Sequence, residues 1–162
     1  MQIKNVDIYT DGAARGNPGP GGFGVVLLSG NLRKELSEGY RHTTNNRMEL
    51  LAVIRGLETL KREDIRVRVF TDSKYVSEAV NQGWLEKWKK KNFKKVKNVD
   101  LWMKFIELYN KFSPEFIWIK GHADNKENER CDQLAVEASH SANLTEDVGY
   151  ISGEDEKFVT FF

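Results

Sequence analysis

The sequence has little cysteine and little histidine. Among its 162 residues there is one Cys, Cys131, and there are three His. A single cysteine excludes an internal disulfide, and a reducing compartment, the cytoplasm, is the default expectation. So few sulfur and imidazole ligands make a zinc site an unfavourable interpretation. A lone thiol of this kind is more often core filler than a nucleophile.

Long apolar runs are also missing. No stretch approaches the roughly 18 apolar residues of a membrane-spanning helix. The N-terminal residues, MQIKNVDIYTD, are typical of a strand and lack the apolar core of a signal peptide. With 40% hydrophobic and 30% charged residues, the composition is that of an ordinary globular protein. We expect one monomeric domain over residues 1–142 and a tail over 143–162 that is either flexible or docks elsewhere.

Net charge is close to zero, at +1, but the charge is unevenly placed. The stretch from Trp84 to Lys104 holds eight Lys against two acidic residues, so the rest of the chain is net negative. Such segregation favours one basic contact surface on a neutral body. A solvated, lysine-rich loop is the alternative.

The hydrophobic pattern predicts an α/β fold. Strands are expected over residues 3–10, 23–29, 32–40, 65–71 and 116–120, and helices over 47–61, 73–80, 84–90, 99–112 and 126–141. The tripeptide SGN between the second and third strands indicates a hairpin. A leading meander followed by β/α alternation predicts a mixed sheet with helices packed on its faces.

Two predicted strands end alike, with IYTDG at Asp11 and VFTDS at Asp72. Ligand sites in open α/β sheets lie beyond the carboxyl ends of strands. Each acid also has a plain structural explanation. Asp11 with Gly12 could form a turn, and Asp72 could be the N-cap of the helix that follows.

Two further acids lie on the apolar faces of predicted helices. Glu49 shares its face with small and apolar residues, and a capping box with Asn46 would explain it. Asp132 repeats this pattern near the C-terminus, with Ala135 and Ser139 on its face. An acid that faces the core needs a partner. If the four acids converge, that partner is either Lys or Arg in a structural ion network or a hard divalent metal.

The chain closely resembles type 1 ribonuclease H, a family that hydrolyses the RNA strand of RNA/DNA hybrids. The resemblance rests on YTDGAARGNPGPGGFG, GYRHTTNNRMEL, FTDSKYV, WKKKNFKKVKNVDLW and WIKGHADNKENERCDQLA, which occur in the order of the family. It implies a five-stranded mixed sheet, with its first three strands antiparallel, flanked by helices and bearing a basic protrusion. It also implies a metal-dependent endonuclease that uses two Mg²⁺ ions, for which Mn²⁺ can substitute, and leaves 5′-phosphate and 3′-hydroxyl ends.

The resemblance assigns roles residue by residue. Asp11, Glu49, Asp72 and Asp132 match the metal-binding carboxylates of the family, and His122 matches a histidine thought to assist water activation or product release. The glycine-rich loop, which has no phosphate-binding GK[ST] motif, would approach the minor groove of the hybrid. Matched to contacts with the hybrid are Gly16, Asn17, Thr44, Asn45, Asn46, Lys74, Trp84, Trp88, Lys89, Lys90, Lys91, Lys94, Lys95 and Asn98.

Some of these residues carry alternatives or depart from the family pattern. Trp84 and Trp88 could be core residues rather than contacts, and Lys74 stands where some relatives have Gln. For the whole chain, three other functions compete: a non-catalytic hybrid-binding module, an integrase-like DNA-cutting enzyme, and a structural ion network around the acids.

Overall fold

The computed structural model describes residues 4–121 and 124–150. Ten elements follow one another in the predicted order, which is thereby confirmed. They are β1 (Lys4–Ala14), β2 (Gly19–Ser29), β3 (Leu32–Thr43), α1 (Asn45–Glu58), β4 (Ile65–Thr71), α2 (Lys74–Asn81), α3 (Trp84–Lys90), α4 (Val99–Phe112), β5 (Glu115–Trp118) and α5 (Lys126–Ser139).

The strands form one mixed sheet in the order β3-β2-β1-β4-β5. The β1–β2 and β2–β3 pairs are antiparallel, and β4 pairs in parallel with both β1 and β5. The predicted hairpin is present: Ser29 pairs with Leu32, and Gly30 turns the chain with a φ of 58°. The expected fold class, a five-stranded mixed sheet with three antiparallel leading strands, is therefore confirmed.

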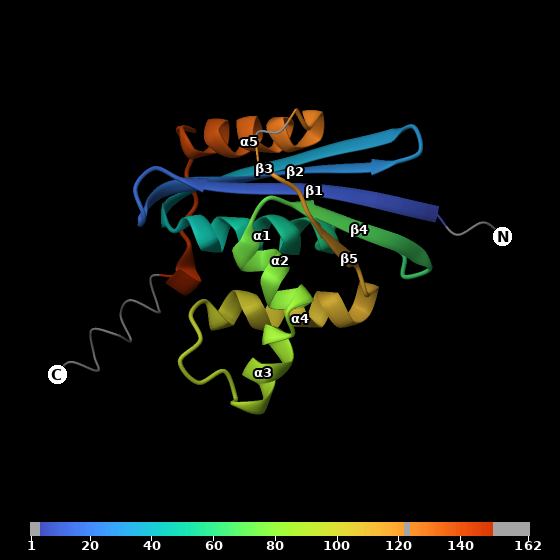
Figure 1. The fold of residues 1–162 in the computed structure, drawn as a ribbon. Helices are drawn as coiled ribbons and strands as arrows, with labels where there is room; N and C mark the ends of the chain where they lie inside the picture. The colour runs from blue at the N-terminus through green and yellow to red at the C-terminus, as the bar shows by residue number, and fades with distance from the viewer. Residues whose placement is uncertain (1–3, 122–123, 151–162) are drawn as a thin grey trace.

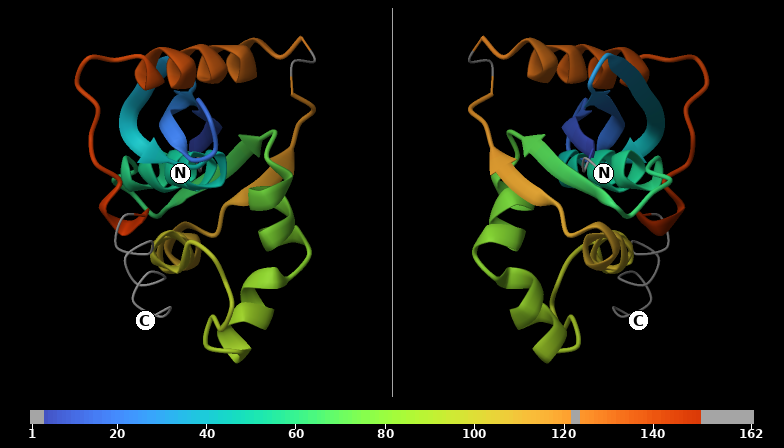
Figure 2. Two further views of the ribbon diagram at one scale, coloured as in Figure 1. Left: turned by 90° about the vertical axis from the view of Figure 1, so that its left-hand side faces the viewer. Right: turned by 90° about the vertical axis from the view of Figure 1, so that its right-hand side faces the viewer.

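Helices cover both faces of this sheet (Figures 1 and 2). The larger core lies between the sheet and α1 and α4, and it includes Ile8, Val25, Leu50 and Trp102. A smaller core lies under α5, where Cys131 is fully buried against Val26 and Leu134, as expected for a core-filling thiol. None of the described helices is long and apolar enough to cross a bilayer.

Helix α5 lies unusually close to the sheet because the strands beneath it carry glycines. A Cβ atom on Gly24 would lie 2.3 Å from the carbonyl oxygen of Cys131, and one on Gly39 would lie 2.0 Å from that of Ala138. Neither position has room for a side chain. The glycines of β2 and β3 therefore set the height of α5, and with it the position of Asp132, above the sheet.

The chain after α5 passes from one face of the sheet to the other around its β3 edge (Figure 2). Thr145 donates from its amide to the carbonyl of Gly39 at 2.8 Å and accepts from the amide of Arg41 at 2.9 Å. This part of the expected tail thus contacts the domain. The division at residue 142 remains a prediction, and residues 151–162 lie outside the described part of the chain.

Candidate active site

Three carboxylates meet near the end of the central strands. Asp11 comes from β1, Glu49 from α1, and Asp72 directly follows β4. Each offers an oxygen atom that lies within 4.8 Å of the others. Asp11 and Glu49 are only 6% and 4% exposed, so their charges are removed from bulk water. Such a group of buried oxygen ligands suits a hard divalent cation.

Gly12 holds two of these acids in place. Its amide donates to Asp11 Oδ1 and to Glu49 Oε1, at 2.9 Å each. A Cβ atom at Gly12 would lie 2.4 Å from the amide nitrogen of Glu49, so only glycine lets α1 approach β1 this closely. The capping-box interpretation of Glu49 is therefore wrong. Thr44, whose hydroxyl accepts from the amide of Arg47, is the N-cap of α1.

The structural explanations for the two strand-end aspartates are also wrong. Asp11 is not in a turn, because β1 continues to Ala14 and Asp11 pairs with Gly24 of β2. Asp72 is not the cap of α2, because the hydroxyl of Ser73 accepts the bond from the amide of Val76. Both carboxylates thus belong to the cluster, and neither serves a turn or a helix cap.

The cluster strongly disfavours its own ionisation. Burial, with the neighbouring carboxylates of Asp72 and Asp132, raises the pKa of Asp11 to about 7. Burial and the Asp11 carboxylate raise the pKa of Glu49 well above its usual range. Among the described residues, no Lys or Arg forms an ion pair with Asp11 or Glu49. The structural ion network therefore lacks its cation at these two acids.

The residues fit a divalent metal. Glu49 Oε2 is buried and has no hydrogen-bond partner in the described structure, which leaves it as a ligand oxygen. Asp132, on α5, is outside the group of three but close enough for its charge to raise the pKa of Asp11. The structure therefore brings three of the four predicted acids together, with the fourth beside them. His122 lies outside the described residues.

The predicted nucleic-acid contacts fall into two groups. Asn17 accepts from the amide of Asn45 at 3.1 Å, so the β1–β2 loop, which includes Gly16, meets the start of α1, where Asn46 is exposed. The second group lies on α3 and the loop after it, which project away from the sheet (Figure 1). This projection carries Lys89, Lys90, Lys91, Lys94 and Lys95.

The tryptophans of this projection are both core and surface residues. Trp84 and Trp88 are partly buried against the main core, and the ring of Trp88 lies 5.0 Å from that of Trp102. The core interpretation therefore accounts for part of each side chain and leaves an exposed part. Nearer the acids, the Lys74 ammonium lies 5.4 Å from the centre of the Trp118 ring.

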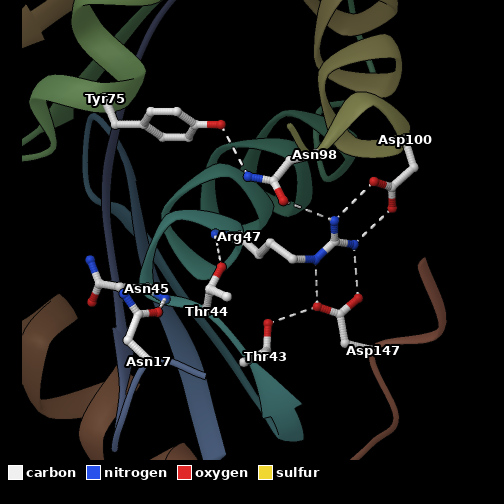
Figure 3. A network of polar contacts seen from close by, with 9 residues as sticks. All are labelled: Asn17, Thr43, Thr44, Asn45, Arg47, Tyr75, Asn98, Asp100 and Asp147. Atoms are coloured by element: carbon white, nitrogen blue, oxygen red, sulfur yellow. Dashed lines mark hydrogen bonds and ion pairs between the residues drawn. The ribbon is translucent and has the colours of Figure 1, made fainter. Parts of the chain in front are cut away.

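Sequence reasoning missed a buried polar network that starts at Arg47 (Figure 3). The Arg47 side chain is 2% exposed and forms ion pairs with Asp100 and Asp147. A signal was present in the sequence, because the residues three, four and seven positions after Arg47 are Leu50, Leu51 and Ile54. A cation on such an apolar stripe needs buried carboxylates.

Comparisons with known proteins agree with this geometry. The family model described as RNase H matches residues 3–140. The chain is 55% identical to a ribonuclease H of Syntrophus aciditrophicus, over 91% of this chain and 87% of the relative. It is 53% identical to a ribonuclease H of Trichodesmium erythraeum, over 90% and 95% of the two chains.

Solved structures show the same likeness. The crystal structure of LC9-RNase H1, a type 1 RNase H, superposes with a TM-score of 0.75 and 29% identity over 86% of this chain and 74% of that one. LC11-RNase H1, solved in complex with an RNA/DNA hybrid, superposes with a TM-score of 0.64 and 31% identity over 83% and 96% of the two chains. On the strength of the fold, the acidic cluster and these relatives, the chain belongs to the ribonuclease H family.

Proposed function

We propose that this protein is an endoribonuclease that hydrolyses the RNA strand of RNA/DNA hybrids with two Mg²⁺ ions. The observation that carries the proposal is the convergence of Asp11, Glu49 and Asp72 within 4.8 Å. The relatives named ribonuclease H, and the solved complex of LC11-RNase H1 with a hybrid, support the same activity. Asp132 would complete the metal-binding set. Mn²⁺ would substitute for Mg²⁺, since both suit carboxylate ligands.

The chain itself supplies carboxylate ligands that are buried and held in fixed positions. Burial of Asp11 and Glu49 strengthens every electrostatic interaction at the cluster, and the shared bond to the Gly12 amide keeps both carboxylates oriented before substrate binds. Asp11, Glu49, Asp72 and Asp132 would hold two divalent ions, which would supply positive charge for activating a water molecule and for stabilising the leaving oxygen. The products would be 5′-phosphate and 3′-hydroxyl ends. His122 would assist proton transfer or product release.

Substrate selection would come from polar groups beside the cluster. RNA is distinguished from DNA by its 2′-hydroxyl, which both donates and accepts hydrogen bonds. The amide side chains of Asn17, Asn45 and Asn46 offer both functions. The lysines of the α3 projection would bind the DNA strand through charge and counterion release.

A DNA phosphate would bind between Thr44 and Asn98. These residues are the N-caps of α1 and α4, and the Arg47 side chain of α1 contacts Asn98, so the two helix N-termini lie side by side. Helix N-termini attract anions through their free amide groups and their dipoles.

A non-catalytic hybrid-binding module is the second candidate. It has the fold and the basic surface in its favour, but binding alone requires no convergent carboxylates. We also propose that the protein is a monomer and that it lies in the cytoplasm; the single cysteine supports the second of these, a reducing compartment.

The test is cleavage of a hybrid labelled on its RNA strand, with Mg²⁺ or with a chelator. The native chain should cut the RNA only with metal, and Asp72→Asn should bind the hybrid without cutting it. Asp64→Asn is the matched control, since Asp64 is exposed and forms an ion pair with its neighbour Arg62. Binding without cleavage under any divalent metal would favour the binding module, and equal cutting of duplex DNA would favour an integrase-like enzyme.

A further inference from the structure

The guanidinium of Arg47 has all its hydrogen-bonding capacity in use (Figure 3). Asp147 accepts from Nε and Nη2 at 2.7 and 2.9 Å. Asp100 accepts from Nη1 and Nη2 at 2.9 and 2.7 Å, and Asn98 Oδ1 accepts from Nη1 at 3.3 Å. These five bonds match the five N–H donors of an arginine. The group is therefore fixed in position and has no donor left for a ligand.

Arg47 joins the two side chains between which we placed a phosphate. Its backbone amide donates to the Thr44 hydroxyl at 3.2 Å, and its side chain donates to Asn98. Because the Thr44 oxygen accepts this bond, its own O–H is directed elsewhere as a donor. The backbone of residue 47 thus meets Thr44, as in an ordinary helix cap, and the Arg47 side chain sets the direction of Asn98.

The Asn98 side chain bonds to this network instead of capping its own helix. Asparagine at an N-cap normally accepts from an amide of the first helical turn, but here the side chain makes no capping bond. Asn98 also has a φ of 59°, a conformation that costs energy in most residues. Its amide is bonded at both ends, since Oδ1 accepts from Arg47 and Nδ2 donates to Tyr75 Oη at 3.1 Å.

Tyr75 is itself held by the core. Its hydroxyl accepts a second bond, from Trp102 Nε1 at 2.9 Å, and Trp102 is fully buried. Tyr75 therefore uses one of the two N–H groups of the Asn98 amide and fixes the direction of the other. A donor whose direction is already fixed loses little conformational entropy when it binds an anion.

The net charge around Arg47 would oppose phosphate binding rather than favour it. One guanidinium is paired with two carboxylates, so the group carries a net negative charge that would repel a phosphate. Any favourable effect on phosphate binding must come from orientation. Removing a negative charge beside Arg47 should therefore strengthen phosphate binding if repulsion dominates and weaken it if orientation dominates.

We propose that Arg47, held by Asp147 and Asp100, is a positioning residue whose side chain orients the Asn98 amide, so that this amide and the Thr44 hydroxyl act as paired donors to one phosphate of the DNA strand. The inference rests on the proposed function. Its consequence is that the segment after α5, which lies beyond residues 3–140 of the family match, sets the affinity for the hybrid through Asp147. Asp147 is 7% exposed and is also bonded by the Thr43 hydroxyl at 2.7 Å, so it is built into the domain.

The experiment measures hybrid affinity in an Asp72→Asn background, which removes cleavage. Asp147→Asn should weaken binding about tenfold, the loss expected for one hydrogen bond to a charged phosphate. Glu146→Gln is the matched control: it also removes one negative charge from the same segment, but at an exposed side chain, and should stay within about twofold of the parent. Tighter binding by Asp147→Asn would mean that its charge alone matters, and unchanged binding would mean a purely structural role. Either result overturns the proposal.

Two further variants locate the effect. In an Asn98→Ala background, Asp147→Asn should cause much less additional loss, because the two changes act on one contact. Tyr75→Phe, which alters no charge, should also weaken hybrid binding. If Asp147→Asn does not fold, Tyr75→Phe is the deciding variant. Hybrid affinity equal to that of the parent would then refute the inference. If the Asp72→Asn parent itself fails to bind hybrid, the proposed function fails instead.

Discussion

At the scale of single residues, the charge of Asp11 destabilises the folded protein, and its proposed role as a metal ligand explains why it is there. Its carboxyl is buried among other acids, and its pKa is raised to about 7. At pH 8 without metal, its charge therefore opposes folding. We expect Asp11→Asn to raise the free energy of unfolding under these conditions by about 2 kcal/mol, while abolishing cleavage.

Chemical denaturation in chelator at pH 8 measures this effect. Asp64→Asn, at an exposed site, should leave the free energy of unfolding within about 0.5 kcal/mol of the native value. A loss of stability in Asp11→Asn would show that the Asp11 charge is compensated within the protein, contrary to the cluster described above.

Trp118 is a second residue whose role is local and testable. Its indole nitrogen donates to the carbonyl oxygen of Asp72 at 3.0 Å, at the end of β4. Trp118→Phe keeps an aromatic ring beside Lys74 but removes this donor. We expect kcat to fall about tenfold as the Asp72 carboxylate loses its fixed position, with hybrid affinity changed less than twofold. Steady-state cleavage and binding in parallel would check this, and an unchanged kcat would remove Trp118 from the site.

At the scale of elements, the close approach of α5 to the sheet makes Gly24 a position with both structural and catalytic consequences. A methyl group there would collide with the Cys131 carbonyl, so α5 must move outward and carry Asp132 with it. We expect Gly24→Ala to cost about 2 kcal/mol of stability and to lower kcat at least tenfold. Gly30→Ala is the control, because its turn is strained by a side chain but has open space around it. It should cost stability alone, and a Gly24→Ala variant with native kcat would contradict the argument.

The elements themselves were largely predictable, for physical reasons. Residues 65–71 and 99–112 match the predicted bounds because apolar residues recur regularly along them, and the bounds of 84–90 also match. The second strand begins at Gly19 rather than residue 23, since glycines carry no alternation although they pair with β1 and β3. The family resemblance predicts that the glycine-rich loop approaches nucleic acid, whereas the glycines at positions 12 and 24 are explained by helices packed against them.

At the scale of the whole molecule, the part of the site that sequence patterns predict is its acids, those at strand ends and those on apolar helix faces such as Glu49. Asp11 and Asp72 follow from a rule about where ligands bind in such sheets. The Arg47 network could not be predicted in this way, because Arg47, Asn98, Asp100 and Asp147 come from three distant segments of the chain. Only the packing of α1, α4 and the segment after α5 brings them together.

The cluster should also couple the stability of the whole molecule to pH and metal. The folded pKa of Asp11, about 7, is raised above its ordinary value of 3.8, so its favourable contribution is complete below about pH 4 and is lost as pH rises through about 7. The raised pKa of Glu49 acts in the same direction. A divalent cation binds the ionised carboxylates, so it should recover stability mainly at high pH.

We therefore expect Mg²⁺ at about 100 times its dissociation constant to stabilise the native protein by roughly 2.7 kcal/mol at pH 8 and by much less at pH 5. Thermal unfolding at both pH values, with Mg²⁺ or chelator, provides the measurement. Asp72→Asn should lose most of the Mg²⁺ effect at pH 8, because the cluster loses one of its three converging carboxylates. Equal stabilisation of the native and Asp72→Asn proteins would place the ion elsewhere on the surface. Stabilisation independent of pH would show that the acids bind it without releasing protons.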